Sequence, residues 1–250
     1  MGRYRNELRQ RWLALRLALR GAIHQYPEIM ALRRFLAAFE VDCLFDVGAN
    51  KGQYAMTLRR EVGFTGTILS FEPNPDIFLV LSRRAASDAS WHVFNMALSD
   101  FDGTAKFNIM AADQFSSLEM PADGQDAIFT TRNIVTNVVE TDCRRLASLL
   151  PELQAAHGFS RPFLKMDTQG HDLAVCEGAG DALVQMTGIQ TELAVRPIYD
   201  GATDYRAMTD WLDQRGFAPS AFFANNKGHF PLLVEMDGIF ANRALLARAA

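Results

Sequence analysis

A glycine-rich turn follows an acidic residue in the segment LFDVGANKGQY, residues 44–54. Gly48 and Gly52 enclose three residues, and Asp46 lies two positions before the first glycine. Glycines in such a turn allow a ligand to approach the backbone closely. The spacing does not match the G-x-G-x-x-G of dinucleotide sites, and a carboxylate beside the turn would repel a pyrophosphate. The turn therefore predicts a positively charged ligand, such as S-adenosylmethionine with its sulfonium and amino groups.

Two further segments supply candidate contacts for such a cofactor. GTILSFEP ends with Glu72, whose carboxylate is placed to accept hydrogen bonds from both ribose hydroxyls. WHVFNMALSD ends with residues 95–99, which are expected to flank an adenine ring. The alternative is that Asp46 caps a helix and Glu72 is a surface acid. The predicted cofactor-binding residues are Asp46, Gly48, Asn50, Gly52, Tyr54, Glu72, Pro73, Asn74, Asn95, Ala97 and Leu98.

A parallel sheet is needed to position these residues. Apolar segments expected to be strands alternate with helical segments, which indicates an α/β, Rossmann-like fold with helices on both faces. The last two strands, joined by the short loop NNKGH, are predicted to form an antiparallel hairpin at one edge. Extra strands interrupt the alternation within an insertion at about 100–161. The predicted strands are 41–47, 66–73, 91–100, 103–110, 133–141, 161–170, 188–195, 217–225 and 230–242.

Composition limits the class of protein. The chain has 250 residues, 49% of them hydrophobic, which is enough for one large domain, and its net charge of -4 argues against nucleic acid as a partner. The three cysteines, Cys43, Cys143 and Cys176, are far apart and lack a CxxC spacing, so neither a disulfide framework nor a zinc site is expected. Neither a transmembrane helix nor a signal peptide is expected, and a cytoplasmic location is predicted.

The N-terminal 40 residues differ from the domain expected at 41–243 and the tail at 244–250. Residues 1–21 hold six arginines and one acid, with Leu8, Trp12, Leu15 and Leu19 at helical spacing. A second helix is predicted from Pro27 to about residue 39. The two helices are expected to cap the domain or to pair with a second copy. The alternative is a basic amphipathic helix in peripheral contact with the inner surface of a membrane.

Several short motifs, in order between residues 43 and 217, resemble the FkbM family of S-adenosylmethionine-dependent methyltransferases. They are FDVGANKGQY, FEPNP, ALSD followed by GTAKF, SSL, FLKMDTQGHDLAVCEGA and TELAVRPIYDG. The resemblance implies a seven-stranded class I methyltransferase fold and O-methylation of a hydroxyl group. The implied acceptors are sugars in glycolipids, polysaccharides or glycosylated natural products, with polyketide or small-molecule hydroxyls as the alternative. Two positions depart from the family pattern, Asp172 in place of glutamate and TDCRRL at 141–146.

The segment FLKMDTQGHD is expected to face the acceptor. Methyl transfer to an alcohol requires an aligned oxygen and removal of a proton, and a positioned base contributes about 10²–10⁴-fold. Asp167 ends an interior strand, Lys165 lies two residues earlier on the same strand face, Glu192 ends the next strand and His171 begins a helix. We predict these four residues as the catalytic cluster. The alternative is a buried Lys165–Asp167 ion pair, a surface His171 and a helix-terminal charge at Asp172.

Weaker predictions concern the rim of the site and the class of function. Ser116 and Ser117 are predicted either to bind ligand or to stabilise a turn, and Tyr199 either to stack on a sugar or to pack. No third acid accompanies Asp167 and Glu192 at a suitable position, so no metal is predicted. A non-catalytic binding module is the alternative to an enzyme. A dehydrogenase is not supported, because the turn lacks a pyrophosphate loop.

Overall fold

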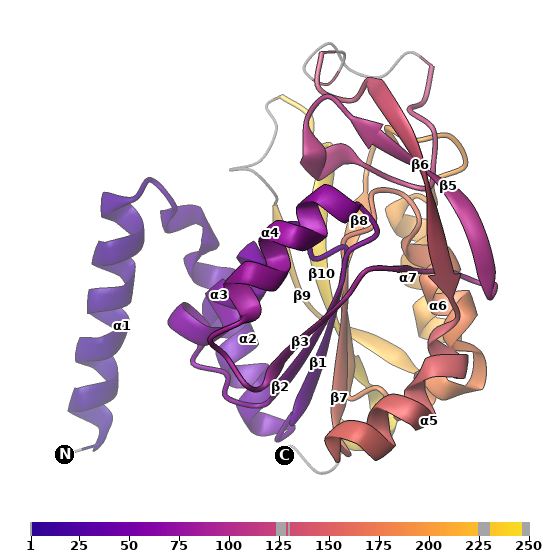
Figure 1. Ribbon diagram of the computed structural model, residues 1–250. Helices are drawn as coiled ribbons and strands as arrows, with labels where there is room; N and C mark the ends of the chain where they lie inside the picture. Colours follow the sequence, from indigo (N-terminus) through magenta and orange to yellow (C-terminus); the bar gives the residue numbers. More distant parts are fainter. Residues whose placement is uncertain (1, 124–128, 130, 225–230, 247–250) are drawn as a thin grey trace.

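The centre of the molecule is a seven-stranded sheet with the strand order β3-β2-β1-β7-β8-β10-β9 (Figure 1). The computed structural model describes residues 2–123, 129, 131–224 and 231–246, with side chains of the first helix described from residue 10 onward. The parallel strands are β1 (Cys43–Val47), β2 (Thr67–Phe71), β3 (Trp91–Phe94), β7 (Pro162–Met166) and β8 (Gly188–Ala194). The antiparallel edge consists of β9 (Phe217–Ala224) and β10 (Glu235–Asn242). The predicted fold class and edge hairpin are confirmed, while loop residues 225–229 lie outside the described chain.

Helices cover both faces of this sheet, as the alternating sequence predicts. One face packs against α2 (Tyr26–Ala38), α3 (Gln53–Thr57) with its π-helical extension η2 (Leu58–Val62), and α4 (Pro75–Ala85). The other packs against α5 (Leu146–His157), α6 (Asp172–Ala179), η4 (Gly180–Gln185) and α7 (Tyr205–Gln214). Alternate residues of β1 belong to the two apolar cores, because successive strand residues point to opposite faces. Both faces of the central strands are therefore buried.

The insertion contains a second, three-stranded sheet with the order β4-β6-β5. Its strands are β4 (Ala97–Leu98), β5 (Gly103–Met110) and β6 (Val135–Arg144). The short helix η3 (Asp113–Phe115) follows β5, and α5 follows β6. Two predictions need correction here. The single strand expected at 91–100 is divided into β3 and β4, which belong to different sheets. The insertion also contains α5, a helix absent from the predicted elements, which buries leucines at helical spacing and has Pro151 inside it.

The first N-terminal helix packs on the protein through other residues than the predicted apolar stripe. α1 (Gly2–Leu19) and the short helix η1 (Ile23–Gln25) precede α2, and α1 stands at the outside of the molecule (Figure 1). Leu13 and Leu17 are buried against Ile29 of α2, whereas the predicted stripe of Trp12, Leu15 and Leu19 faces solvent. The Leu8 side chain is outside the described part. The tail begins with α8 (Arg243–Leu246), and residues 247–250 are not described. Among the described helices, none has the length and apolar character to cross a membrane.

Candidate functional site

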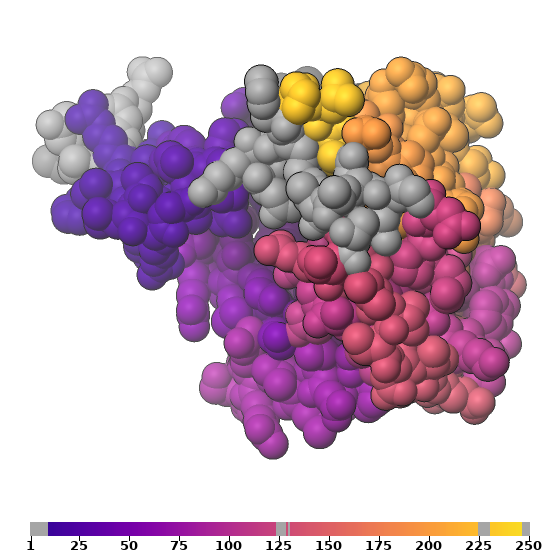
Figure 2. Space-filling model, turned by 90° about the horizontal axis from the view of Figure 1, so that it is seen from above, coloured from indigo at the N-terminus to yellow at the C-terminus, as the bar shows by residue number. Residues whose placement is uncertain are grey.

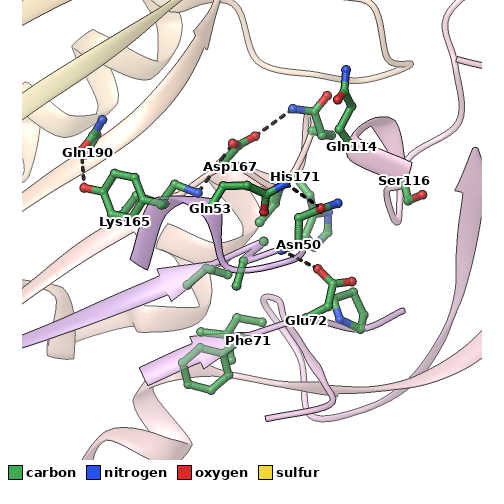
Figure 3. A pocket seen from close by; sticks show the side chains of 18 of the residues that line it. Asn50, Gln53, Phe71, Glu72, Gln114, Ser116, Lys165, Asp167, His171 and Gln190 are labelled. Atoms are coloured by element: carbon green, nitrogen blue, oxygen red, sulfur yellow. Dashed lines mark hydrogen bonds and ion pairs between the residues drawn. The ribbon is translucent and has the colours of Figure 1, made fainter. Parts of the chain in front are cut away.

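A cavity of about 320 Å³ opens over the carboxyl ends of β1 and β7. These two strands are neighbours at the point where the strand order reverses, which is where open α/β sheets bind ligands. Residues from the glycine turn, the ends of β2 and β7, the insertion and α2 line it (Figure 3). Of the predicted cofactor residues, seven line the cavity, namely Gly48, Asn50, Tyr54, Glu72, Pro73, Ala97 and Leu98.

The two glycines of the turn allow close packing against neighbouring protein atoms. Gly48 and Gly52 both have positive φ, +74° and +81°, in the left-handed region. A β-carbon on Gly48 would lie 2.0 Å from the carbonyl oxygen of Asp167, and one on Gly52 would lie 2.7 Å from the Trp91 ring. The space that a side chain at Gly48 would enter is therefore filled by the backbone of Asp167, although Gly48 itself lines the cavity. Gly48 lets the turn lie against the end of β7, and Gly52 does not line the cavity.

The Glu72 carboxylate is held in place by the backbone. The Asn50 and Asn74 amides each donate to one carboxylate oxygen at 2.8 Å, and Asn95 Nδ2 donates to the Glu72 carbonyl at 2.8 Å. Asn74 also accepts hydrogen bonds from the first turn of α4. Asn74 and Asn95 do not line the cavity, so these two residues are positioning residues. Burial raises the pKa of Glu72 to about 7, and each oxygen retains a lone pair for a ligand hydroxyl.

Apolar side chains line the cavity on the other side of Glu72. They come from the end of β2, the β3–β4 connection, β4 and β5, and comprise Phe71, Met96, Ala97, Leu98 and Phe107. Such a slot suits a flat, weakly polar ring, and Glu72 beside it suits a diol. Phe107 was not predicted, because its strand belongs to the second sheet, whose position over the cavity no sequence pattern indicates.

Asp46 lies beneath the cavity and does not line it. Its side chain is completely buried, accepts a hydrogen bond from Ser70 at 3.1 Å and lies 3.4 Å from Lys165 Nζ. Trp91 Nε1 in turn donates to Ser70 at 2.9 Å. Burial raises the pKa of Asp46, against the opposing effect of Lys165. Direct contact between Asp46 and a ligand is not supported, because Lys165 lies between this carboxylate and the cavity.

Lys165 connects this buried carboxylate to the cavity. Its ammonium lies 3.6 Å from Asp167 Oδ2 and 5.0 Å from the centre of the Tyr54 ring. The strand register explains the cluster, since Asp46 of β1 and Gln190 of β8 both pair with Lys165 of β7 and point to the same face. Burial lowers the pKa of Lys165, but Asp167 and Asp46 raise it by more, so its net pKa lies above the usual value. The lysine therefore stays charged.

Asp167 is the carboxylate best placed for an incoming acceptor. Its side chain lines the cavity and is 42% exposed, although Lys165 beside it is only 7% exposed. Gln169, which was not predicted, donates from Nε2 to Asp167 at 2.8 Å and to Glu192 at 2.9 Å. Gln169 has a positive φ of 56°, a strained conformation that turns its amide between the two acids. Glu192 therefore belongs to the cluster through Gln169 and does not line this cavity, and burial raises its pKa well above the usual value.

His171 lines the cavity, and both of its ring nitrogens have partners. Nδ1 lies 2.7 Å from Glu119 Oε1, and Nε2 lies 3.0 Å from Ser99 Oγ. It is not a surface residue. Glu119 was missed because it lies in the insertion, with no sequence pattern that pairs it with His171. The neighbouring Asp172 is buried and accepts from the Thr168 amide at 2.8 Å and from Thr191 Oγ1 at 2.6 Å, so it shapes the turn after β7.

The helix α2 contributes a wall that the sequence did not predict. Gln190 donates to Glu28 of α2 at 2.8 Å and accepts from the Tyr54 hydroxyl at 2.6 Å. Glu28, Gln190 and Asp237 of β10 all line the cavity beyond Lys165. The pKa values of Glu28 and Asp237 are raised, first by burial. Three acidic residues, Glu28, Asp167 and Asp237, thus line the same cavity as Lys165.

The insertion closes the cavity from the opposite side. Asp113 forms an ion pair with Lys51 of the glycine turn, and both Asp113 and Ser116 are at the cavity wall. Ser117 is buried and donates to the Gln169 carbonyl at 2.8 Å, which ties the insertion to the turn after β7. The buried Tyr199 donates its hydroxyl to the Phe115 carbonyl or to Gln169, each at 2.9 Å. Ser117 and Tyr199 therefore stabilise the wall, while Ser116 lines the cavity and its Oγ accepts from the Met110 amide at 3.1 Å.

The features required for S-adenosylmethionine occur together in this cavity. An apolar slot suits adenine, the Glu72 oxygens suit the ribose diol, and the acidic surroundings suit the sulfonium and amino charges. Within the described residues there is no group of three or more His, Cys, Asp or Glu side chains that could hold a metal ion. The sheet order and this site together define a class I, S-adenosylmethionine-dependent methyltransferase.

The chain belongs to the FkbM methyltransferase family. The family's model, described as the methyltransferase FkbM domain, matches residues 46–219, which agrees with the resemblance in the sequence motifs. No curated protein matches the chain in sequence.

Solved structures with a similar fold include other methyltransferases. The FkbM methyltransferase from Methylobacillus flagellatus is 14% identical with a TM-score of 0.50, over 80% of this chain and 43% of that chain. The present chain thus spans less than half of that protein. The N-methyltransferase NodS from Bradyrhizobium japonicum is 11% identical with a TM-score of 0.47, over 88% and 96% of the two chains. Fibrillarin from Aeropyrum pernix, solved with natively bound S-adenosylmethionine, is 10% identical with a TM-score of 0.43, over 80% and 66%. At 14% identity, the likeness to the Methylobacillus flagellatus structure shows the fold alone.

Proposed function

We propose that this methyltransferase acts on a hydroxyl oxygen of a sugar, in a glycolipid, a polysaccharide or a glycosylated natural product. The observation that carries the proposal is the position of Asp167, a carboxylate partly exposed in the cavity and fixed by Gln169 and Lys165. An alcohol is a weak nucleophile that gains from a nearby base, whereas a neutral amine needs none to attack. A carboxylate in this position therefore favours an oxygen acceptor.

The lining beyond Lys165 supports a hydroxyl-rich acceptor. Carboxyl and amide side chains predominate there, supplied by α2, β8 and β10, and they include Glu28, Gln190 and Asp237. The structure describes no hydrogen bond to the Asp237 carboxyl group. Such groups offer both donors and acceptors, which suits several neighbouring hydroxyls better than an extended apolar chain.

The residues divide the chemistry between them. S-adenosylmethionine supplies, when bound, an electrophilic methyl group on a sulfonium. Asp167 would accept the proton of the acceptor hydroxyl as that oxygen receives the methyl group, and S-adenosylhomocysteine would be the leaving group. Lys165 forms an ion pair with Asp167, and Gln169 fixes the orientation of this carboxylate, because an amide between two carboxylates restricts both. Alignment of this kind can supply much of the rate, about 7–11 kcal/mol in favourable cases.

Release of S-adenosylhomocysteine in the presence of methyl glycosides, phenols and amines tests the proposal. We expect turnover with glycosides, and turnover with amines alone would contradict O-methylation. Asp167→Asn should lower kcat by about 10²-fold or more, because the acceptor is no longer deprotonated. S-adenosylhomocysteine binding, measured by calorimetry, should stay within about threefold of wild type. Asp181→Asn, an exposed acid outside the cavity, is the matched control and should leave both values unchanged.

A further inference from the structure

The outward side of α1 is apolar and has no partner within the described chain. Trp12, Leu15 and Leu19 are 69%, 50% and 80% exposed, while Leu13 and Leu17 on the other side are each 3% exposed. Ile23, four residues after Leu19, is 48% exposed. Figure 2 shows this N-terminal segment extending from one side of the molecule. Large apolar side chains at this spacing on one exposed helix form a surface that usually contacts something else.

The attachment of α1 to the rest of the protein fixes which side faces outward. Arg16 and Arg20 form ion pairs with Glu61 of η2, and Arg33 of α2 donates to the Glu61 carbonyl. Together with Leu13 and Leu17, these contacts leave no freedom for the helix to turn its apolar stripe inward. The exposure of Trp12 therefore follows from packing around Glu61, a residue that is itself largely buried.

Charge identifies the kind of partner. The first 21 residues carry six arginines and one glutamate, and no acidic residue lies between Leu8 and Pro27. The segment thus has a net charge of +5 in a chain of net charge -4, so the remaining residues carry -9. A negatively charged surface would attract α1 and repel the rest of the protein. A second copy presenting the same helix would instead bring arginines together.

We propose that α1 lies on an anionic lipid bilayer, with Trp12, Leu15 and Leu19 at the boundary between headgroups and acyl chains. The flanking arginines, Arg11 among them, contact lipid phosphates. Helices that lie in this interface combine an apolar stripe that includes tryptophan with arginine or lysine on the polar side. The proposal is independent of the acceptor, because it rests on the face of α1 that is turned away from the cavity.

Vesicle flotation of the full chain tests the proposal. We expect binding to phosphatidylcholine vesicles that contain phosphatidylglycerol, and much weaker binding to phosphatidylcholine alone or in high salt, where charges are screened. The double variant Trp12→Gln/Leu19→Gln should lower the partition coefficient by about tenfold or more. Leu79→Gln/Val184→Gln, which removes two exposed apolar side chains elsewhere, is the matched control and should bind as wild type does.

A charge reversal separates the electrostatic part. Arg11→Glu should weaken flotation, whereas Arg83→Glu, the same change at an exposed position on α4, should not. S-adenosylhomocysteine binding by all variants would confirm that they fold. Equal flotation with neutral and anionic vesicles, or none with either, would overturn the proposal. So would a wild-type dimer in sedimentation velocity that Trp12→Gln/Leu19→Gln converts to a monomer without any vesicle binding, because a second copy would then cover the stripe.

Discussion

The two halves of the cavity hold their carboxylates in different ways. In the cofactor half, backbone amides of Asn50 and Asn74 donate to Glu72. In the acceptor half, side chains hold the acids, since Lys165 and Gln169 contact Asp167 and Gln190 contacts Glu28. The first arrangement is built by the turns at two strand ends. The second depends on residues from four elements meeting on one face of the sheet.

This difference suits the two tasks. A cofactor shared by a whole class of enzymes can be bound by backbone geometry, which tolerates sequence change because every residue has an amide. An acceptor that differs between enzymes calls for side chains, because these can be exchanged without altering the fold. We therefore expect changes in the acceptor half to alter charge balance and rate, and changes in the cofactor half to alter backbone packing and ligand affinity.

The largest effect on stability is expected from the cation of the acceptor half. Lys165→Met removes the ammonium between Asp46 and Asp167 and leaves a buried carboxylate uncompensated, which should cost about 3–5 kcal/mol in the free energy of unfolding at pH 8. The pKa of Asp46 would rise further without its partner, so in the folded protein this carboxylate would take up a proton at a higher pH than in wild type. The loss should therefore be smaller at pH 5 than at pH 8 in urea titrations.

Lys106→Met provides the control for this substitution, because Lys106 is exposed on β5. It should change the free energy of unfolding by no more than about 0.5 kcal/mol. If Lys165→Met were as mild as this control at both pH values, the buried cluster would not depend on its lysine.

A backbone effect is expected in the glycine turn. Gly48→Ala would place a β-carbon 2.0 Å from the Asp167 carbonyl oxygen, whereas Gly63→Ala meets nothing within 4 Å at a similar φ of +82°. Gly63→Ala should cost about 1 kcal/mol for its left-handed conformation, and Gly48→Ala about 3 kcal/mol or more, since backbone must move. Urea unfolding of the pair measures the difference. Equal costs would mean that the contact with β7 is not rigid.

The sequence indicates the cofactor half of the cavity better than the acceptor half, because the first is built by local turns and the second by side chains from separate elements. Strand ends followed by a glycine turn or an acid are local patterns, and they located Gly48, Asn50 and Glu72 correctly in the cavity wall. The pattern could not show that Asp46 is fully buried, lies outside the cavity lining and forms an ion pair with Lys165. Glu192, His171 and Gln190 are the distant partners of Gln169, Glu119 and Glu28, and no spacing along the chain indicates these contacts.

A smaller effect is expected from the protonation of Glu72. Its pKa of about 7, raised by burial, lies above that of the unfolded chain. The protonated form therefore stabilises the fold at low pH, and this contribution is lost as the pH rises through about 7. Ribose hydroxyls donate hydrogen bonds more strongly to the ionised Glu72 carboxylate than to its protonated form. The affinity for S-adenosylhomocysteine should therefore increase about tenfold between pH 6 and pH 8, or about 1.4 kcal/mol. Calorimetry of Glu72→Gln should show weaker binding without this slope, and a slope of equal size in the variant would assign it to another group.

No change at all is expected on removal of metal ions. The two acids that face each other in the acceptor half, Asp167 and Glu192, share the Gln169 amide, so an N–H donor already occupies the position between them. Magnesium requires near-octahedral oxygen ligands, and a donor group at the centre of the pair opposes that geometry. The rate of S-adenosylhomocysteine release with a methyl acceptor should therefore be the same in EDTA and in added magnesium. Loss of turnover in EDTA that magnesium restores would show that Gln169 moves aside and that the acceptor half binds through a cation.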